Sequence, residues 1–420
     1  GIYFRKNKMT DFIEVNTDLH MHGIYSGAVS GSMIPKVIAE QAPLKGLHVV
    51  GSSDILNNKW VKLLKEQLKQ SKEGILEAEN GTKFILQTEV EDSNRVHHII
   101  LFPSFSKVEE VREKLKNKCK DFDSDGRPKI WVNGEELAEI CVNADCLVGF
   151  AHAFTPYFGI FSKFDSYKKC YGSMWSKIYF LEMGLSADTN MADRISELHN
   201  LTFTSNSDAH SPWPNKLGRE FNTLKIKDID FEEIAKALKR ENGRKCVLNV
   251  GFNPLEGKYH KTRCTGCLSF FDPNEAERLK WKCSNCGKSI KKGADYRIEE
   301  LSDLPLGKHP DHRPEYKHII PLSEIIALAL DISNTWSIKV QSIWKRFVDK
   351  FDNEINVLLD VEIKELAKVN EKVAEYIKFF REDKIKYVPG GAGVYGKLVK
   401  PGEEIEVNKM NIRQKKLGEF

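Results

Sequence analysis

The sequence predicts an α/β domain followed by a small cysteine-rich module and an α-helical region. Three observations support this architecture. Short β-like runs alternate with helical patterns up to about residue 250, two close pairs of cysteines follow, and apolar residues then recur at helical spacing between about 322 and 386. A chain of 420 residues is long for one domain and sufficient for two or three.

The first region alternates two kinds of segment. Its β-like runs are 13–19, 48–52, 83–91, 96–102, 146–152, 178–183 and 201–205, and its helical patterns include 60–72, 108–117, 134–143 and 191–198. This alternation is typical of an α/β domain with a largely parallel sheet or barrel. Functional side chains gather at the carboxyl ends of strands in such domains. We therefore expect the unusual polar residues to lie there.

The composition limits the possible functions only broadly. The chain is 41% hydrophobic and 30% charged, as expected for an ordinary globular protein, and its net charge of +4 is too small to prove a polyanionic partner. No apolar run approaches the roughly 20 residues of a membrane span. We expect a cytoplasmic monomer without membrane contact. Residues 1–8 lack an apolar signal core, and we interpret them as a tag remnant or leader before Met9.

Histidines and carboxylates gather at the ends of the predicted strands. The segment Asp18-Leu-His20-Met-His22 ends the first strand, and residues two apart on an extended chain point the same way, so both imidazoles can reach one ion. Similar residues at or beside other strand ends are Asp54, Glu89, Glu91, His97, His98, His152, Asp208 and His210. Histidine and carboxylate together bind Zn²⁺, Mn²⁺ or Fe²⁺. The sequence therefore predicts a metal centre.

The order of these residues, Asp-x-His-x-His, then Asp, Glu, His, His and Ser-Asp-Ala-His, resembles the polymerase and histidinol phosphatase (PHP) superfamily. The resemblance implies a distorted (β/α)₇ barrel with two or three metal ions at its carboxyl-terminal mouth. By motif matching, the ligands of the first ion would be His20, His22, Glu89 and Asp208. Glu89 would bridge to a second ion held by His98 and His152, with His97 as a lower-ranked alternative to His98.

Asp54 and His210 remain as ligands for a third ion in this comparison. The usual Asp-His of the second motif reads Asp54-Ile55, and Ala28 stands where the superfamily has a ligand. These departures favour a two-metal centre or a weak third site. A metal-bound water held by Asp208, Glu89 and His152 would then hydrolyse a phosphate ester directly. Zn²⁺ is the expected ion, with Mg²⁺ or Mn²⁺ as alternatives.

The two cysteine pairs, Cys264-x₂-Cys267 and Cys283-x₂-Cys286, have the spacing of a structural zinc site. Basic and aromatic residues surround them, which suits contact with a DNA backbone and stacking on bases. The candidate contacts are Arg263, Lys280, Trp281 and Lys282. The alternative is a solvated basic surface that only supports the fold.

Two further segments are candidates for contact with DNA. Aromatic residues crowd the stretch after His152, and Tyr157 and Phe158 are candidates for a pocket that receives a base turned out of the duplex. The same residues also suit the underside of a long loop. The Gly-rich stretch 389–397 predicts a turn, with approach to a DNA backbone as one reading.

The complete arrangement resembles the endonuclease Q family. The predicted parts are a PHP domain (9–250), a four-Cys zinc ribbon (251–320), a helical domain (321–388), a Gly-rich turn with hairpin (389–412) and a tail (413–420). The resemblance implies that the chain binds damaged double-stranded DNA and nicks it on the 5′ side of uracil, hypoxanthine, xanthine or an abasic site. Two alternatives are a small-molecule phosphatase of the histidinol phosphatase kind and a non-catalytic DNA-binding adaptor.

The tail contains Gln414, Leu417 and Phe420 at spacings of three. This pattern resembles the peptide by which repair enzymes bind a sliding clamp, with the two apolar side chains entering a groove on the clamp. A polar tail with two incidental apolar residues is the alternative.

Overall fold

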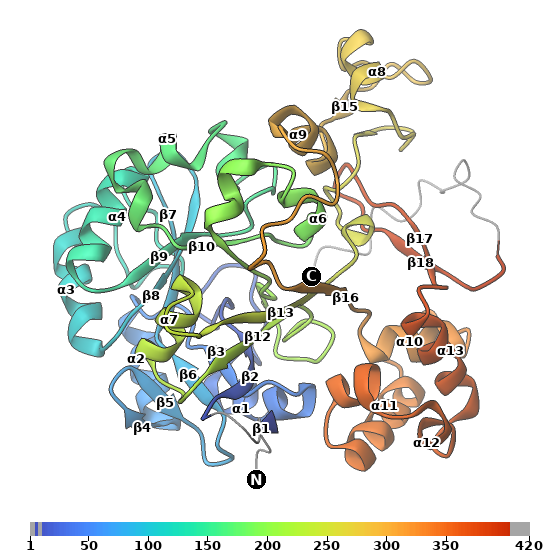
Figure 1. Cartoon of the computed structure of the whole chain (residues 1–420), viewed down its shortest axis with the longest axis horizontal. Helices are drawn as coiled ribbons and strands as arrows, with labels where there is room; N and C mark the ends of the chain where they lie inside the picture. The colour runs from blue at the N-terminus through green and yellow to red at the C-terminus, as the bar shows by residue number, and fades with distance from the viewer. Residues whose placement is uncertain (1–4, 7–10, 404–420) are drawn as a thin grey trace.

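A computed structural model describes residues 5–6 and 11–403 of the chain (Figure 1). In this part of the chain, nine strands form one sheet in the order β16-β13-β12-β2-β3-β6-β5-β4, with β1 added beside β2. Their bounds are β1 (Arg5–Lys6), β2 (Ile13–Asp18), β3 (Val49–Gly51), β4 (Lys69–Lys72), β5 (Ile75–Glu77), β6 (Lys83–Ile85), β12 (Phe221–Ile226), β13 (Lys245–Gly251) and β16 (Glu315–His318).

A second sheet has the order β11-β10-β9-β8-β7. Its strands are β7 (Gln87–Glu91), β8 (His97–Leu101), β9 (Leu147–Phe150), β10 (Phe180–Glu182) and β11 (Thr202–Thr204). The chain passes directly from β6 to β7, so the predicted strand 83–91 is divided between the sheets at Leu86. At the other end, Asn249 of β13 donates a hydrogen bond to the carbonyl of Phe203 in β11, at 2.9 Å. The two sheets are therefore joined at both sides, and we refer to the two together as the barrel.

The predicted α/β class is confirmed, but the strands are of mixed orientation. β2, β3 and β6 pair in parallel, as do β9, β10 and β11, whereas β7, β8 and β9 pair antiparallel. β8 runs opposite to both of its neighbours because a tight turn follows β7. In this turn, Asp92 Oδ1 accepts hydrogen bonds from the backbone N–H groups of Asn94 and Val96. A short turn reverses the chain, whereas parallel neighbours need a long crossover.

Helices cover the outside of the sheets. They are α1 (Pro35–Lys45), α2 (Asn58–Gln67), α3 (Phe105–Leu115), α4 (Gly134–Asn143), α5 (Tyr167–Tyr171), α6 (Thr189–Ala192) and α7 (Phe231–Lys239), with short 3₁₀ turns η1 (Ile160–Ser162), η2 (Gly172–Lys177) and η3 (Ser196–Asn200). Side chains of Asn57, Ser104, Asn133 and Asp230 cap α2, α3, α4 and α7. The predicted helix 60–72 ends at Gln67, because 69–72 forms β4 at the sheet edge.

The cysteine-rich module projects from the barrel at the upper right of Figure 1. It contains β14 (Arg263–Cys264), α8 (Pro273–Arg278) and β15 (Ile290–Lys291), and a small apolar cluster of its own around Phe271 and Ala276. The short turn η4 (Pro254–Glu256) precedes it and α9 (Ala294–Leu301) follows. β16, which lies in the range predicted as ribbon, pairs in parallel with β13 of the barrel sheet.

The helical region lies at the lower right of Figure 1. Its helices are α10 (Leu322–Ala329), α11 (Ile338–Phe351), the π-helix η5 (Asn356–Asp360), α12 (Ile363–Ala367) and α13 (Glu371–Arg381). Val340, Trp344 and Phe347 are buried as the periodicity predicts, but Trp336 precedes α11 and remains 46% exposed. None of the described helices is long and apolar enough to cross a membrane.

The Gly-rich turn connects β17 (Lys386–Val388) and β18 (Lys397–Val399), which pair antiparallel between the ribbon and the helical region (Figure 1). The turn packs closely against 255–261. The N–H of Gly390 donates to the carbonyl of Leu255 at 2.7 Å, and the N–H of Gly393 donates to that of Lys258 at 2.9 Å. The predicted clamp-binding residues Gln414, Leu417 and Phe420 lie outside the described residues.

Candidate metal centre

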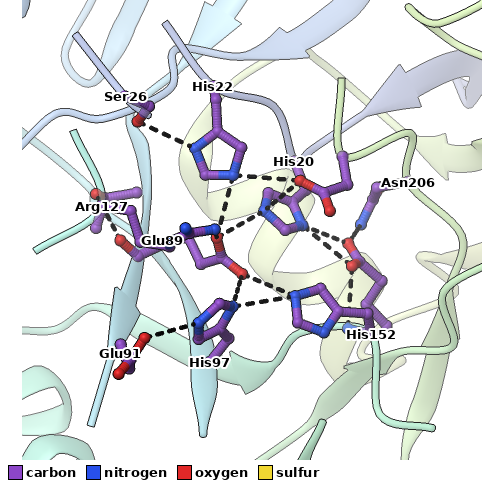
Figure 2. A network of polar contacts seen from close by, with 12 residues as sticks. His20, His22, Ser26, Glu89, Glu91, His97, Arg127, His152 and Asn206 are labelled. Atoms are coloured by element: carbon purple, nitrogen blue, oxygen red, sulfur yellow. Dashed lines mark hydrogen bonds and ion pairs between the residues drawn. The ribbon is translucent and has the colours of Figure 1, made fainter. Parts of the chain in front are cut away.

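Four donor groups meet where the two sheets come together. His20 and His22 follow β2, Glu89 lies in β7 and Asp208 follows β11, and one donor atom from each lies within 4.8 Å of all the others. His22 Nε2 lies 3.1 Å from Glu89 Oε2 and 3.2 Å from Asp208 Oδ1, and His20 Nε2 lies 3.6 Å from the same two oxygens. Figure 2 shows both imidazoles turned toward Glu89. The structure thus assembles the four residues predicted for the first ion.

The donor set fits a divalent cation. Nε2 of His20, Nε2 of His22 and Oδ1 of Asp208 are buried, and none of them has a hydrogen-bond partner among the residues that the structure describes. A buried polar atom without a partner costs about 1–3 kcal/mol. Imidazole nitrogens and carboxylate oxygens are the ligands that zinc and related ions prefer. A bound ion would satisfy all three atoms.

A second group shares the Glu89 carboxylate. Glu89 Oε1 lies 2.9 Å from His97 Nδ1 and 3.0 Å from His152 Nε2, and these two nitrogens are 3.2 Å apart. Oε2 of the same carboxylate faces the first group. One carboxylate oxygen toward each group is the arrangement by which Glu89 can bridge two ions.

His98, predicted for this second group, is not part of it. In the β7–β8 ladder His97 pairs with Glu91 and His98 pairs with Val90. Paired residues lie on the same face and neighbours alternate, so His97 shares the face of Glu89 and Glu91. His98 points to the opposite face, where Nε2 lies 2.9 Å from Asp92 Oδ2 and Nδ1 lies 2.7 Å from the Tyr171 hydroxyl.

Cys170 joins Asp92 and His98 in a third buried group of donor atoms within 4.8 Å of one another. Both nitrogens of His98 already have hydrogen-bond partners there. Burial also raises the pKa of the Cys170 thiol, which disfavours the thiolate that binds metal. We interpret this group as a buried, hydrogen-bonded polar cluster behind β8.

The structure gives Asp54 a supporting position instead of a place among the metal donors. Its Oδ1 lies 3.2 Å from His22 Nδ1, and its Oδ2 accepts hydrogen bonds from the Gly23 N–H and the Ser26 hydroxyl. These contacts turn His22 so that Nε2 faces Glu89. His210 donates from Nδ1 to the carbonyl of Asp208 at 2.9 Å, and its side chain is 35% exposed. Within residues 11–403, neither Asp54 nor His210 enters a group of three donors.

Glu182 and Arg127 belong to the site but were not predicted. Glu182 ends β10 and accepts hydrogen bonds from His20 Nδ1 at 2.9 Å, from the Asn206 amide at 2.9 Å and from the His152 N–H at 3.1 Å. Arg127 Nη1 lies 3.5 Å from Glu89 Oε2. Glu182 lies at a strand end, so its position in the sequence could have identified it as a site residue. Arg127 lies on a loop, where no pattern in the sequence indicates that it belongs to the site.

Opposite charges in the site shift the pKa values of their neighbours. Burial alone lowers the pKa of His20, but the carboxylates of Glu182, Asp208 and Glu89 outweigh it and raise that pKa well above its usual value. Burial alone raises the pKa of Glu89, but His97 and His20 outweigh it and hold that pKa well below its usual value. The Glu89 carboxylate is therefore ionised, as a metal ligand must be.

The backbone at the site is strained at three non-glycine residues. His152, Asp208 and Asp54 have positive φ values of 27°, 48° and 35°. Such conformations cost energy and occur mainly where the surrounding structure enforces them, often at functional sites. Gly184 leaves room for the strained conformation of His152, because a Cβ on residue 184 would lie only 2.9 Å from the Cβ of His152.

The four predicted cysteines also come together. Sγ of Cys264 lies 3.5 Å from Sγ of Cys286, and Sγ of Cys267 lies 3.5 Å from Sγ of Cys283. Sγ of Cys264 accepts a hydrogen bond from the Gly266 N–H at 3.2 Å. Hydrogen bonds from Ser269 lower the pKa of Cys267 to about 6. These features fit a four-thiolate metal site.

The predicted DNA contacts in the ribbon are divided between its surface and its interior. Lys280 and Lys282 are exposed, and Trp281 is half-buried against Tyr296. Arg263 is only 1% exposed, with Nε donating to the carbonyl of Leu268 and the guanidinium 4.4 Å from the Phe270 ring centre. The prediction of DNA contact for Arg263 is therefore wrong, because its guanidinium supports the loop between the cysteines.

The predicted base-pocket residues lie beside the second metal group. Phe158 stacks on His97 with ring centres 4.4 Å apart and an interplanar angle of 9°. Tyr157 is 45% exposed, and its ring lies 5.5 Å from that of Tyr259 and 4.6 Å from Lys291 Nζ. An exposed aromatic thus stands between the metal centre and the ribbon.

Known proteins are similar to most of this chain. The family model described as MJ0043 C-terminal domain matches residues 321–384. The uncharacterized protein MJ0043 of Methanocaldococcus jannaschii is 45% identical over 260 residues, 61% of this chain but 32% of its own length, so the match spans about a third of that relative. The uncharacterized protein YqxK of Bacillus subtilis is 30% identical over 92% of this chain and 99% of its own length.

Two solved structures match almost from end to end. The lesion-specific endonuclease PfuEndoQ from Pyrococcus furiosus is 46% identical, with a TM-score of 0.89 over 95% of this chain and 98% of its own. Endonuclease Q in complex with a 27-mer duplex carrying an abasic lesion at the active site is also 46% identical, with a TM-score of 0.88 over 95% of this chain and 99% of its own. The chain therefore belongs to the endonuclease Q family.

Proposed function

We propose that this protein is a metal-dependent endonuclease that nicks duplex DNA at damaged nucleotides. The observation that carries this is the Glu89 carboxylate, which faces one donor group with each oxygen. The likeness to an endonuclease described as lesion-specific, and to one bound to an abasic duplex, supports DNA as the substrate. Abasic sites and the deaminated bases uracil, hypoxanthine and xanthine are the proposed lesions, with cleavage on their 5′ side.

Six side chains would hold two ions, namely His20, His22, Glu89, His97, His152 and Asp208. Ions there would polarise the scissile phosphate and activate water. We propose Zn²⁺ for both positions, with Mg²⁺ or Mn²⁺ as alternatives, and Zn²⁺ for the cysteine site. No third ion is proposed.

The other residues of the site orient these ligands and add charge. Glu182 and Asp54 bind the Nδ1 atoms of His20 and His22, so both Nε2 atoms face the centre. The guanidinium of Arg127 lies beside Glu89 and would attract the phosphate diester. Attack by water requires no protein nucleophile. Phe158 and Tyr157 would contact the damaged nucleotide next to the ions.

The test is a nicking assay on labelled duplexes that carry one abasic site, uracil or hypoxanthine, with an undamaged duplex as reference. The enzyme is supplied with Zn²⁺, Mg²⁺ or Mn²⁺, and each product end is mapped. We expect the wild type to cleave on the 5′ side of the lesion, and we expect Asp208→Asn to lose this activity. Asp228→Asn is the control and should keep it, because Asp228 is exposed and its ion pair among the described residues is with Lys72. Equal cleavage of damaged and undamaged duplexes would refute lesion specificity. Hydrolysis of phosphate monoesters alone would indicate a small-molecule phosphatase.

A further inference from the structure

Three cations gather around the Tyr395 side chain at the edge of the Gly-rich turn. They are Lys216 and Arg219, from the loop after Asp208, and Lys258, from the segment before the ribbon. Lys258 Nζ lies 5.5 Å from the centre of the Tyr395 ring, which is 47% exposed. None of the three cations forms an ion pair with any residue in the part of the chain that the structure describes.

The electrostatics of Tyr395 reflect this arrangement. Burial alone raises the pKa of its phenol, but the charges of Arg219, Lys258 and Lys216, with a hydrogen bond from Arg219, outweigh burial and lower that pKa. Burial and the neighbouring Arg219 also lower the pKa of Lys216. The lowered pKa of Tyr395 agrees with an excess of positive charge around its phenol.

In the described part of the chain, no nearby acid forms an ion pair with the cations of the cluster. Burial raises the pKa of Glu220 and of Glu256 well above the usual value, which favours their uncharged forms. Glu324 acts on Lys216 and Arg219, but it also faces Lys45 and its own pKa is raised by burial. Convergent cations that form no ion pair within the described residues favour an anionic ligand.

The cluster is held in a fixed relation to the metal centre. Asp18 Oδ1 accepts from the Ser207 N–H and Oδ2 from the Gly218 N–H, each at 3.0 Å. Arg219 Nε donates to the Ser207 carbonyl at 3.0 Å, and Ser207 precedes the metal-site residue Asp208. Gly218 has a φ of 62°, and a Cβ there would lie 2.8 Å from the Lys45 side chain, so only glycine fits this corner.

The other side of the cluster is fixed by the Gly-rich turn. The N–H of Gly396 donates to the carbonyl of Glu256 at 3.0 Å, and the N–H of Gly393 donates to that of Lys258. A Cβ on Gly396 would lie 2.5 Å from the Leu255 carbonyl oxygen. This close backbone packing places Tyr395 over Lys258 and explains why the turn needs glycine.

We propose that Lys216, Lys258 and Tyr395, with the buried guanidinium of Arg219 behind them, form a subsite for a second phosphate of the DNA backbone, distinct from the phosphate that is cleaved. This rests on the proposed function, because the ligand is the same duplex. Phosphate contacts position a protein on DNA without reading its sequence. The cluster has a fixed position relative to Asp208. A phosphate bound to the cluster would therefore determine which phosphodiester bond of the DNA lies at the metal ions.

The test is a scan of neutral backbone linkages. Single methylphosphonates replace one phosphate at a time on both sides of an abasic site in a short duplex, and binding is measured for the wild type, Lys216→Met and Lys258→Met. Methionine keeps the apolar stem of lysine and removes its charge. Lys62→Met is the matched control, because Lys62 is 80% exposed on α2 and its only ion pair in the described chain is a weak one with Glu66 at 3.9 Å.

We expect one linkage, other than the scissile one, at which neutralisation weakens wild-type binding about tenfold, the size of one charge-assisted hydrogen bond. Lys216→Met and Lys258→Met should each bind the unmodified duplex about tenfold more weakly and become insensitive to that linkage. For both variants, the slope of log Kd against the logarithm of the salt concentration should be smaller than that of the wild type, by the amount that corresponds to about one phosphate contact. Lys62→Met should retain the wild-type profile.

Two outcomes would overturn the proposal. If the wild type nicks the abasic duplex but both methionine variants keep its full methylphosphonate profile, the subsite is wrong and the proposed function stands. If the wild type neither binds nor nicks the duplex, the proposed function fails and the subsite fails with it. Unfolding midpoints and metal content of the variants, compared with wild type, separate lost contact from lost fold.

Discussion

The Nδ1–H of His20 donates to the carboxylate of Glu182, with Nδ1–oxygen distances of 3.0 and 2.9 Å. This contact fixes the tautomer that leaves Nε2 of His20 facing Glu89 and Asp208. Glu182 also binds Asn206 and the backbone of His152, so one carboxylate supports ligands of both metal groups.

We expect Glu182→Ala to weaken metal binding about 10- to 100-fold, the usual effect of losing a partner behind a metal-bound histidine. Glu182→Gln should lose less, because the amide oxygen can still accept from Nδ1. Metal affinity is measured by titration of the metal-free protein. Glu232→Gln, at an exposed carboxylate on α7, is the control. Unchanged affinity in Glu182→Ala would show that His20 is held without it.

The two adjacent histidines of β8 should behave differently. His97→Ala removes a donor that lies 2.9 Å from Glu89, so we expect one fewer metal ion per chain and loss of nicking. His98→Ala leaves Asp92 and Tyr171 without their shared partner, and we expect a loss of about 1–3 kcal/mol in the free energy of unfolding. Its metal stoichiometry should stay at the wild-type value.

Metal analysis by mass spectrometry and denaturant unfolding check both variants. If His98→Ala instead loses an ion while His97→Ala keeps both, the original motif assignment of His98 is restored.

This pair also shows what the sequence can and cannot predict. His20 and His22 follow a strand at a spacing of two, so their shared direction is a local property and was predicted correctly. Whether His97 or His98 faces Glu89 depends on the register of β7 and β8. That register follows from the turn built on Asp92, which hydrophobic patterning does not display.

The same distinction holds for the fold and for the ribbon. Alternating strands and helices identified the α/β class, but β16 joins β13 through a long-range pairing with no local signature. Four cysteines at typical spacing identified their own cluster. Arg263 looked like a surface cation among other basic residues, whereas its burial depends on the loop conformation at Leu268 and Phe270.

A buried ion pair joins the barrel to the helical region. Nζ of Lys45 in α1 pairs with Glu354, and both side chains are fully buried. Nζ also donates to the Pro214 carbonyl, and Glu354 accepts from Trp344 Nε1 at 2.7 Å. Removing one partner leaves the other charge buried and unpaired, so Glu354→Gln or Lys45→Met should each cost about 3–5 kcal/mol.

The double variant Lys45→Met with Glu354→Gln should recover a large part of that loss, because no unpaired charge then remains. Denaturant unfolding of the four proteins completes the cycle. Losses that simply add would mean that the two charges do not interact in the folded chain.

The ribbon site is expected to control DNA binding through its fold. Cys264→Ser with Cys267→Ser removes two of the four thiolates, and we expect loss of one metal ion per chain and at least tenfold weaker duplex binding. Cys119→Ser, outside the cluster, should keep both properties. Metal analysis and fluorescence anisotropy provide the readouts. Wild-type DNA affinity after loss of that ion would separate the ribbon from DNA recognition.

The last prediction concerns Gln414, Leu417 and Phe420, which lie outside the described residues. In a short helical turn, residues three apart share one side, so Leu417 and Phe420 would enter one apolar groove while Gln414 fills a polar pocket. We expect a peptide spanning 408–420 to bind the sliding clamp of the same organism with roughly micromolar affinity, measured by calorimetry. Leu417→Ala with Phe420→Ala should abolish that binding, whereas Lys415→Ala with Lys416→Ala should keep most of it. In the full chain, the apolar double variant should nick naked DNA at the wild-type rate, because it changes no residue of the metal centre. Absence of measurable heat at clamp concentrations far above the micromolar range would show that the tail is not a clamp-binding peptide.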